Sequence, residues 1–154
     1  PMTIVESVIR ANENQKKRAA KKITDRFPNG GTIALLGLSF KPETDDIRES
    51  PALEIARALL ADPRYTVRMY DPKAKGNAKR VLGTPPNAVW SGGAQEAMQG
   101  ADAVVIATEW AEFCSLDFGA MKRILKQPVF FDLRNIYPKA EVAAAGFEYH
   151  GTGV

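Results

Sequence analysis

Two apolar runs, TIALLGLSF at 32–40 and ADAVVIAT at 101–108, constrain the fold of this chain most strongly. Each has the length of a buried strand and is far too short to cross a membrane. Segments with helical periodicity lie between these runs and the other strand-like segments. This alternation predicts an α/β protein in which a parallel sheet is flanked by helices.

The remaining elements can be placed by periodicity and by breaker residues. We expect further strands at 66–72, 88–90, 128–134 and 147–152, and helices at 50–62, 73–82, 93–100, 115–126 and 138–146. The first of these helices should begin with Ser50 at the N-cap and Pro51 at the first helical position. The fold class is therefore a Rossmann-like, doubly wound parallel sheet, whose ligands sit outside the carboxyl ends of the strands.

The segment before the first strand has the apolar spacing of an amphipathic helix, and PNGG at 28–31 ends it. It begins without a recognisable N-cap, which suggests that the chain starts inside a longer protein. We expect two parts, a helical segment at 1–28 and a Rossmann-like domain at 29–154.

Composition narrows the class of function. The 154 residues fit one domain, and 45% hydrophobic and 25% charged residues are typical of globular proteins. Neither a spanning segment nor a signal peptide is evident, so we expect a cytoplasmic protein without a membrane partner. A single Cys and a single His make a disulfide and a zinc site unlikely by count. The net charge of +3 is mild, and the basic run QKKRAAKK fits a solvated helix face better than a nucleic-acid contact.

The loop GLSFKPETDDIRES, from Gly37 to Ser50, follows the first strand where a dinucleotide fingerprint would stand. It lacks the second and third glycines of that fingerprint, so NAD binding of the usual kind is disfavoured at this turn. Lys41 and Arg48 instead place cations near a helix N-terminus, which favours a phosphate-bearing ligand. Alternatively, Asp45 and Asp46 pair with these cations on the surface, and charge content alone leaves both interpretations open.

Other candidate residues also follow strands. Arg134 in DLRN could bind a diphosphate with its planar fork, or form a structural salt bridge with Asp132. Asp71 stands where a Rossmann strand offers an acid to a ribose, but its spacing from Gly37 is long, and a turn-capping role before Pro72 is favoured. His150 is expected to be an ordinary strand residue.

The motifs GLSFKPETDDIRESPALEI, YDP, ATEWAEF, LDF and DLRNIY occur in this order. Together they resemble the C-terminal, UDP-binding domain of the UDP-glucose/GDP-mannose dehydrogenase family, and within it most closely the UDP-glucose 6-dehydrogenases. The resemblance implies NAD-dependent oxidation of UDP-glucose to UDP-glucuronate in polysaccharide biosynthesis. It also implies a homodimer or higher homo-oligomer, with the first helix following a central dimerisation helix. Alternatives are a dehydrogenase of GDP-mannose or of a UDP-N-acetylhexosamine, and a stand-alone nucleotide-binding module.

The resemblance also assigns roles to residues. Phe40, Lys41 and Arg134 would contact the substrate, and Arg48 would reach toward NAD, which is bound mainly by a domain outside this chain. No catalytic residue is expected here, so the isolated chain should be inactive. Cys114 lies outside the family's glycine-flanked Cys motif and has no neighbouring cation. Glu109 and Trp110 match a family signature without an assignable role, and Leu133 replaces the glycine common in DGRN.

Overall fold

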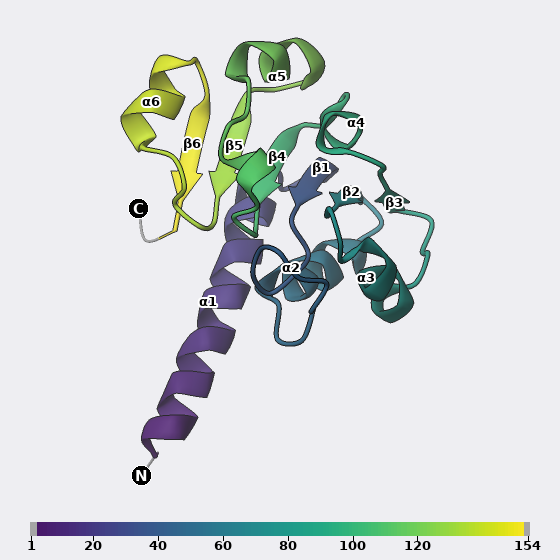
Figure 1. Cartoon of the computed structure of the whole chain (residues 1–154), viewed down its shortest axis with the longest axis vertical. Coiled ribbons are helices and arrows are strands. Elements are labelled where there is room, and N and C mark those ends of the chain that lie inside the picture. Colours follow the sequence, from purple (N-terminus) through teal and green to yellow (C-terminus); the bar gives the residue numbers. More distant parts are fainter. Residues whose placement is uncertain (1–2, 153–154) are drawn as a thin grey trace.

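The computed structural model describes residues 3–152 and shows one six-stranded sheet between two layers of helices (Figure 1). The helices are α1 (Ile4–Arg26), α2 (Pro51–Leu60), α3 (Lys75–Leu82), α4 (Ala94–Met98), α5 (Phe118–Ile124) and α6 (Lys139–Ala144), with a 3-10 turn, η1, at Ala111–Phe113. The strands are β1 (Gly31–Leu36), β2 (Tyr65–Tyr70), β3 (Ala88–Trp90), β4 (Ala103–Ile106), β5 (Val129–Asp132) and β6 (Glu148–Gly151). The predicted order of strands and helices is confirmed.

All six strands are parallel, in the order β3-β2-β1-β4-β5-β6. This is the strand order of a Rossmann sheet, so the predicted fold class is confirmed. The last residues of four adjacent strands stand level with one another, as Leu36 pairs with Tyr70 and Ile106, and Ile106 pairs with Asp132. The loops that follow these strands therefore leave from one edge of the sheet.

The two faces of the sheet form two separate cores. Alternate residues of β1, such as Ile33 and Leu35, face α1, α2 and α3, while Ala34 and Leu36 face α4, α5 and α6. All four side chains are fully buried. Because both faces of β1 are covered, its sequence is apolar at successive positions rather than alternating, which explains the uninterrupted run.

Helix α1 begins with a cap, contrary to the uncapped start expected from the sequence. The Thr3 hydroxyl accepts a hydrogen bond from the Glu6 amide at 3.1 Å, and the Glu6 carboxylate accepts one from the Thr3 amide at 3.0 Å. This reciprocal pair is a capping box, which satisfies two N–H groups that the first turn of a helix leaves free. The TxxE spacing was present in the sequence and is the signal that was missed.

The last turns of α1 contact the domain. Ile23 and Phe27 are buried in the core beneath the sheet, and Arg26 pairs with Glu148 of β6 at 2.8 Å. The first turn is exposed, with Ile4 and Val5 at 84% and 68%, and Figure 1 shows the helix extending well beyond the sheet. The basic run within α1 exposes Lys17, Arg18 and Lys21, while the side chains of its first two residues lie outside the described ones.

Helix α2 starts where it was predicted, with Ser50 at the N-cap position and Pro51 at the first helical position, but the Ser50 side chain does not cap it. Its hydroxyl instead donates to the Leu38 carbonyl at 2.8 Å. Ser50 therefore ties the end of the long loop back to its beginning. No helix in the part of the chain that the structure describes is long and apolar enough to cross a bilayer.

Candidate functional site

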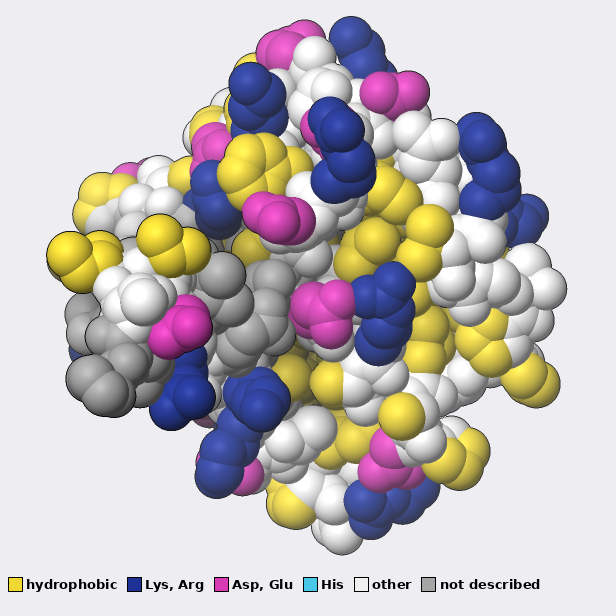
Figure 2. All heavy atoms as spheres, turned by 90° about the horizontal axis from the view of Figure 1, so that it is seen from below, with side chains coloured by type: hydrophobic (Ala, Val, Ile, Leu, Met, Phe, Trp, Pro, Cys, Tyr) yellow, Lys and Arg dark blue, Asp and Glu magenta, His cyan; other side chains and the backbone are white. Residues whose placement is uncertain are grey.

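The candidate residues gather at the carboxyl edge of the sheet. Phe40, Lys41 and Arg48 belong to the loop after β1, and Arg134 belongs to the loop after β5. Strand β4 lies between β1 and β5, so its own loop separates the two groups. Figure 2 looks onto the molecule from below and shows basic, acidic and hydrophobic side chains interspersed, without a block of one charge.

The turn directly after β1 is filled by a side chain of the protein itself. One carboxylate oxygen of Asp71, Oδ2, accepts hydrogen bonds from the amides of Leu38 and Ser39 at 2.7 and 3.0 Å and from the Trp110 indole at 3.2 Å. In a dinucleotide-binding turn the amides after the first strand face the pyrophosphate. Here the amides of Leu38 and Ser39 already bind the Asp71 carboxylate, which is buried with 3% exposure.

The other oxygen of Asp71 organises its own turn. Oδ1 accepts from the amides of Lys73 and Ala74 at 2.9 and 2.7 Å. The turn-capping role predicted for Asp71 is therefore confirmed, and its second role, toward the β1 loop, was missed. With five donors around it and almost no exposure, this carboxylate has no free position for a ribose hydroxyl.

Gly37, the one fingerprint glycine that remains, serves packing between loops. Its φ of 97° is a conformation that favours glycine, and a Cβ at this position would lie 2.6 Å from the Thr108 amide nitrogen. The absent side chain makes room for the β4 loop rather than for a phosphate. Together with the filled amides, this close approach means that the turn does not fit the pyrophosphate of NAD.

The next residues of the loop present side chains to solvent. The amide of Phe40 donates to the Asp46 carbonyl at 2.8 Å, and the Ser39 hydroxyl donates to the Lys41 carbonyl at 2.8 Å. These bonds fix the backbone, while the Phe40 ring is 47% exposed and Lys41 is exposed. Among the described residues, no carboxylate lies within ion-pair distance of the Lys41 ammonium.

Arg48 is occupied by a neighbour. Its guanidinium forms two hydrogen bonds with Asp46, at 3.0 and 2.9 Å, although the Arg48 side chain is 88% exposed. The hydrogen bonds from Arg48 lower the pKa of Asp46 to about 2. Surface pairing, the alternative left open by the sequence, thus holds for Asp46 and Arg48 but not for Lys41. Arg48 also lines an open hollow of about 240 Å³ beside α2.

Arg134 is paired, but not with the partner considered from the sequence. Its guanidinium binds both carboxylate oxygens of Glu109, and only its backbone amide contacts Asp132, at 3.3 Å. A salt bridge with Asp132 was therefore the wrong alternative. The Arg134 and Glu109 side chains are each about one-third exposed, so the pair stands at the surface of the edge.

Asp132 instead holds the β5 loop from within. This fully buried carboxylate accepts from the amides of Ile136 and Tyr137 at 3.1 and 2.9 Å and from the Tyr149 hydroxyl at 3.1 Å. Burial and the nearby Asp132 charge raise the pKa of Tyr149 to about 12. Leu133, in the position of the family's glycine, packs against the core.

Cys114 and His150 behave as expected. Burial, Glu109 and Asp132 raise the pKa of the Cys114 thiol, which disfavours the reactive thiolate. Of the two carboxylates, Glu109 lies in the same loop as Cys114 and Asp132 ends β5. His150 lies in β6, where its ring stacks on Phe131 at 4.5 Å between centroids.

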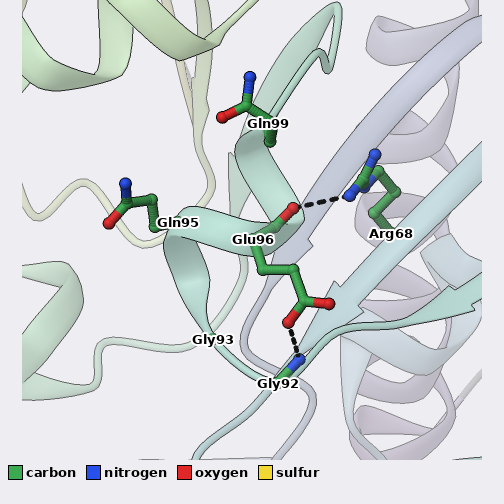
Figure 3. A pocket seen from close by; sticks show the side chains of 6 residues that line it. All are labelled: Arg68, Gly92, Gly93, Gln95, Glu96 and Gln99. Carbon is green, nitrogen blue, oxygen red and sulfur yellow. Dashed lines mark hydrogen bonds between the residues drawn. The ribbon is translucent and has the colours of Figure 1, made fainter.

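A second hollow, of about 550 Å³, lies on the other face of the sheet beside α4 (Figure 3). Arg68 on β2 donates to the Glu96 carbonyl at 2.8 Å, and the Glu96 carboxylate accepts from the Gly92 amide at 2.7 Å. The Nε of Arg68 is buried without a hydrogen-bond partner in the part of the chain that the structure describes. The hollow contains none of the predicted candidates.

The comparisons with known proteins agree with this architecture. Residues 34–139 match the model of the UDP-glucose/GDP-mannose dehydrogenase family, UDP binding domain. A UDP-glucose 6-dehydrogenase of Bacillus subtilis is 44% identical over 97% of this chain and 34% of its own length. The chain spans about a third of the length of the curated relatives it matches.

Two solved structures share the fold. A UDP-glucose dehydrogenase from Pyrobaculum islandicum superposes with a TM-score of 0.75 and 32% identity, over 94% of this chain and 31% of the other. A UDP-D-ManNAc dehydrogenase from Pyrococcus horikoshii gives 0.73 and 30%, over 94% and 32%. The fold, the motifs and the family model agree, and this chain belongs to the UDP-glucose/GDP-mannose dehydrogenase family.

Proposed function

We propose that this chain is the C-terminal, UDP-sugar-binding domain of an NAD-dependent UDP-glucose 6-dehydrogenase. The whole protein would oxidise the C6 alcohol of UDP-glucose to the carboxylate of UDP-glucuronate, with two NAD reduced. The domain would bind and orient the nucleotide handle, which places the reacting carbon for chemistry performed elsewhere. The UDP-glucose 6-dehydrogenases among its relatives support this choice.

One observation carries the proposal. The loops with Lys41 and Arg134 flank the end of β4 on the same edge of the sheet, where ligands of this fold bind. An ammonium and a planar guanidinium suit the oxygens of a diphosphate. The exposed ring of Phe40 adds an apolar surface next to Lys41.

The cofactor would be held mainly outside this chain. The turn after β1 does not fit a pyrophosphate, so within this domain the contact with NAD falls to Arg48, whose exposed side chain can leave Asp46 for another anion. The exposed apolar residues Ile4 and Val5 support the proposal that the 1–28 segment contacts a second copy or another domain, while 29–154 binds the nucleotide.

Calorimetry on the chain with UDP, UDP-glucose, GDP and NAD tests the proposal. We expect weak binding of UDP and UDP-glucose, with Lys41→Ala raising Kd about tenfold because a charge-assisted hydrogen bond is lost. Lys126→Ala, an exposed lysine before β5 at the opposite edge, is the matched control and should change nothing. UDP binding that Lys41→Ala leaves unchanged would remove Lys41 from the site.

Two alternatives have their own tests. The first alternative is a dehydrogenase of a UDP-N-acetylhexosamine or of GDP-mannose. The structural neighbour named as a UDP-D-ManNAc dehydrogenase supports the UDP-sugar version, which would also bind UDP. Rates of NADH production by the full-length protein with UDP-glucose, UDP-N-acetylhexosamines and GDP-mannose separate the two. A stand-alone nucleotide-binding module would produce no NADH with any of them.

A further inference from the structure

The short segment 108–110 after β4 contacts both candidate loops. Thr108 is fully buried, Trp110 is 5% exposed, and Glu109 between them is at the surface. Because β4 lies between β1 and β5, the segment has the Lys41 loop on one side and the Arg134 loop on the other. Its three side chains divide between these two neighbours.

Toward β1, the contacts lead directly to Lys41. The Thr108 hydroxyl donates to the Ser39 carbonyl at 2.7 Å, and the Trp110 indole donates to the Ser39 hydroxyl at 3.2 Å. That Ser39 hydroxyl donates to the Lys41 carbonyl at 2.8 Å. Two consecutive hydrogen bonds therefore connect Trp110 with the backbone of Lys41, of which the first is buried and the second partly buried.

Toward β5, the contact is the ion pair between Glu109 and Arg134. Both carboxylate oxygens engage the guanidinium, which fixes the orientation of the planar group as well as its place. Adjacent residues of one segment thus hold the Arg134 guanidinium directly and, through Ser39, the backbone from which the Lys41 side chain extends.

We propose that Thr108, Glu109 and Trp110 form a positioning segment that sets the separation of Lys41 and Arg134 for one nucleoside diphosphate. The inference rests on the proposed function for the identity of the ligand. Holding two cations in place before binding lowers the ordering cost of the complex, so the segment adds affinity without touching the ligand. Neither Glu109 nor Trp110 is a catalytic residue in this arrangement.

Trp110→Phe tests the β1 side, because it keeps an aromatic ring and removes the indole donor to Ser39 and Asp71, together with part of the ring volume that the control variant also loses. We expect UDP affinity to fall about three- to tenfold, the range for one hydrogen bond. Exchange of the Leu38 and Ser39 amide hydrogens should become faster. The matched control is Trp90→Phe, whose indole donates to the Gly83 carbonyl away from this edge, at 3.3 Å. Unchanged affinity and exchange in Trp110→Phe would overturn the proposal.

Glu109→Ala tests the contact with Arg134, because charge and positioning predict opposite changes in UDP affinity. Charge alone predicts tighter UDP binding once a carboxylate leaves the edge, whereas positioning predicts weaker binding because Arg134 is released. Glu112→Ala is the control for charge, since Glu112 accepts from the Tyr70 hydroxyl and not from Arg134. Tighter binding in Glu109→Ala would contradict the positioning role.

The same experiment separates this inference from the proposed function. If the unaltered chain binds no UDP, the proposed function fails at this domain, and amide exchange in Trp110→Phe still decides whether the segment holds the loop. If UDP binds but neither variant weakens it, the proposed function stands and the positioning role is wrong.

Discussion

The loops after β1 and β5 are both organised by a buried aspartate, but the aspartate comes from a different part of the chain in each loop. Each surrounds a buried aspartate that accepts several backbone amides and one aromatic donor, Trp110 for Asp71 and Tyr149 for Asp132. Asp132 is the last residue of the strand that leads into its own loop. Asp71 instead comes from the neighbouring strand, 32 and 33 residues along the chain from the amides it binds.

This difference separates local from long-range control. The backbone amides of the β5 loop bind the carboxylate of the residue that precedes the loop, and Tyr149 and Thr152 from the β6 region add further bonds. The β1 loop reaches its conformation only when β2 has paired with β1, because Asp71 is then brought level with Leu38. The amides of the β1 loop therefore depend on the pairing of β1 with β2 for their acceptor, whereas those of the β5 loop find their acceptor in the same chain segment.

Among these predictions, replacing Asp71 or Asp132 by asparagine should lower the free energy of unfolding most. Both oxygens of Asp71 face N–H donors that cannot reverse, so one end of an amide would oppose them wherever it turns. We expect a loss of about 3 kcal/mol of unfolding free energy in Asp71→Asn. Asp132→Asn should lose about 2 kcal/mol, because an amide nitrogen at the Oδ2 position would oppose one fixed donor, the Tyr137 amide, while the Tyr149 hydroxyl can turn and accept. Urea unfolding measures both, and equal losses would abolish the distinction between the loops.

Gly37→Ala breaks only the β1 loop. The new Cβ would approach the Thr108 backbone to 2.6 Å at a positive φ, and a loss of about 2 kcal/mol or more is expected. Gly83→Ala is the matched control, since it also has a positive φ but meets nothing within 4 Å. Its cost should be about 1 to 3 kcal/mol from the backbone conformation alone, because φ 75° with ψ −158° is a region essentially restricted to glycine, and Gly37→Ala should cost more than this control. Similar thermal unfolding midpoints for the two variants would contradict the close approach of the loops.

Tyr149→Phe probes the β5 loop through pH. The folded pKa of about 12 lies above the ordinary value of 10.0, so the folded protein retains the hydroxyl proton longer than the unfolded chain. The stabilisation is complete below about pH 10 and declines as the pH rises toward about 12. At neutral pH the variant should lose about 1 kcal/mol with the hydrogen bond, and its alkaline decline should be shallower. Parallel pH curves for the two proteins would rule out Tyr149 as a source of this decline.

Asp46→Asn should have the smallest effect. Its ion pair with Arg48 is solvent-exposed, and such pairs contribute little to stability. We expect no measurable change in the unfolding midpoint at neutral pH, and a fall of the apparent NAD affinity of the full-length protein only if Arg48 needs Asp46 to hold its orientation. Because the lowered pKa of Asp46 is about 2, the pair persists until the pH falls through that value. A clear destabilisation at neutral pH would show that this part of the loop is more constrained than its exposure indicates.

The sequence predicted what depends on neighbours along the chain. Apolar runs and breakers placed the strands and helices, and Asp71 was correctly assigned to the turn that it caps at Lys73 and Ala74. The roles of Phe40, Lys41, Arg48 and Arg134 in binding remain predictions.

Contacts between strands were beyond such reasoning. The pairing of Arg134 with Glu109, 25 residues away, depends on β4 lying beside β5, and the binding of Leu38 by Asp71 depends on the β1–β2 register. The fold class was predicted, but which side chains meet across β4 and β5 or across β1 and β2 depends on the register of each pair, which these short segments did not reveal. The Thr3 cap was different, because its TxxE spacing was present and was overlooked.

The anchoring of α1 has a mechanical consequence. Its last turns are held by Ile23 and Phe27 in the core, and at β6 by the bond from Lys22 to the Gly151 carbonyl and by the Arg26–Glu148 pair. At 23 residues the helix is about 35 Å long, and only a small change in its direction at the anchored end is needed to move its first turn. A tilt of about 5° at the anchored end would displace the first turn by about 3 Å. The direction of the first turn of α1 relative to this domain is therefore set by the few side chains that anchor its last turns.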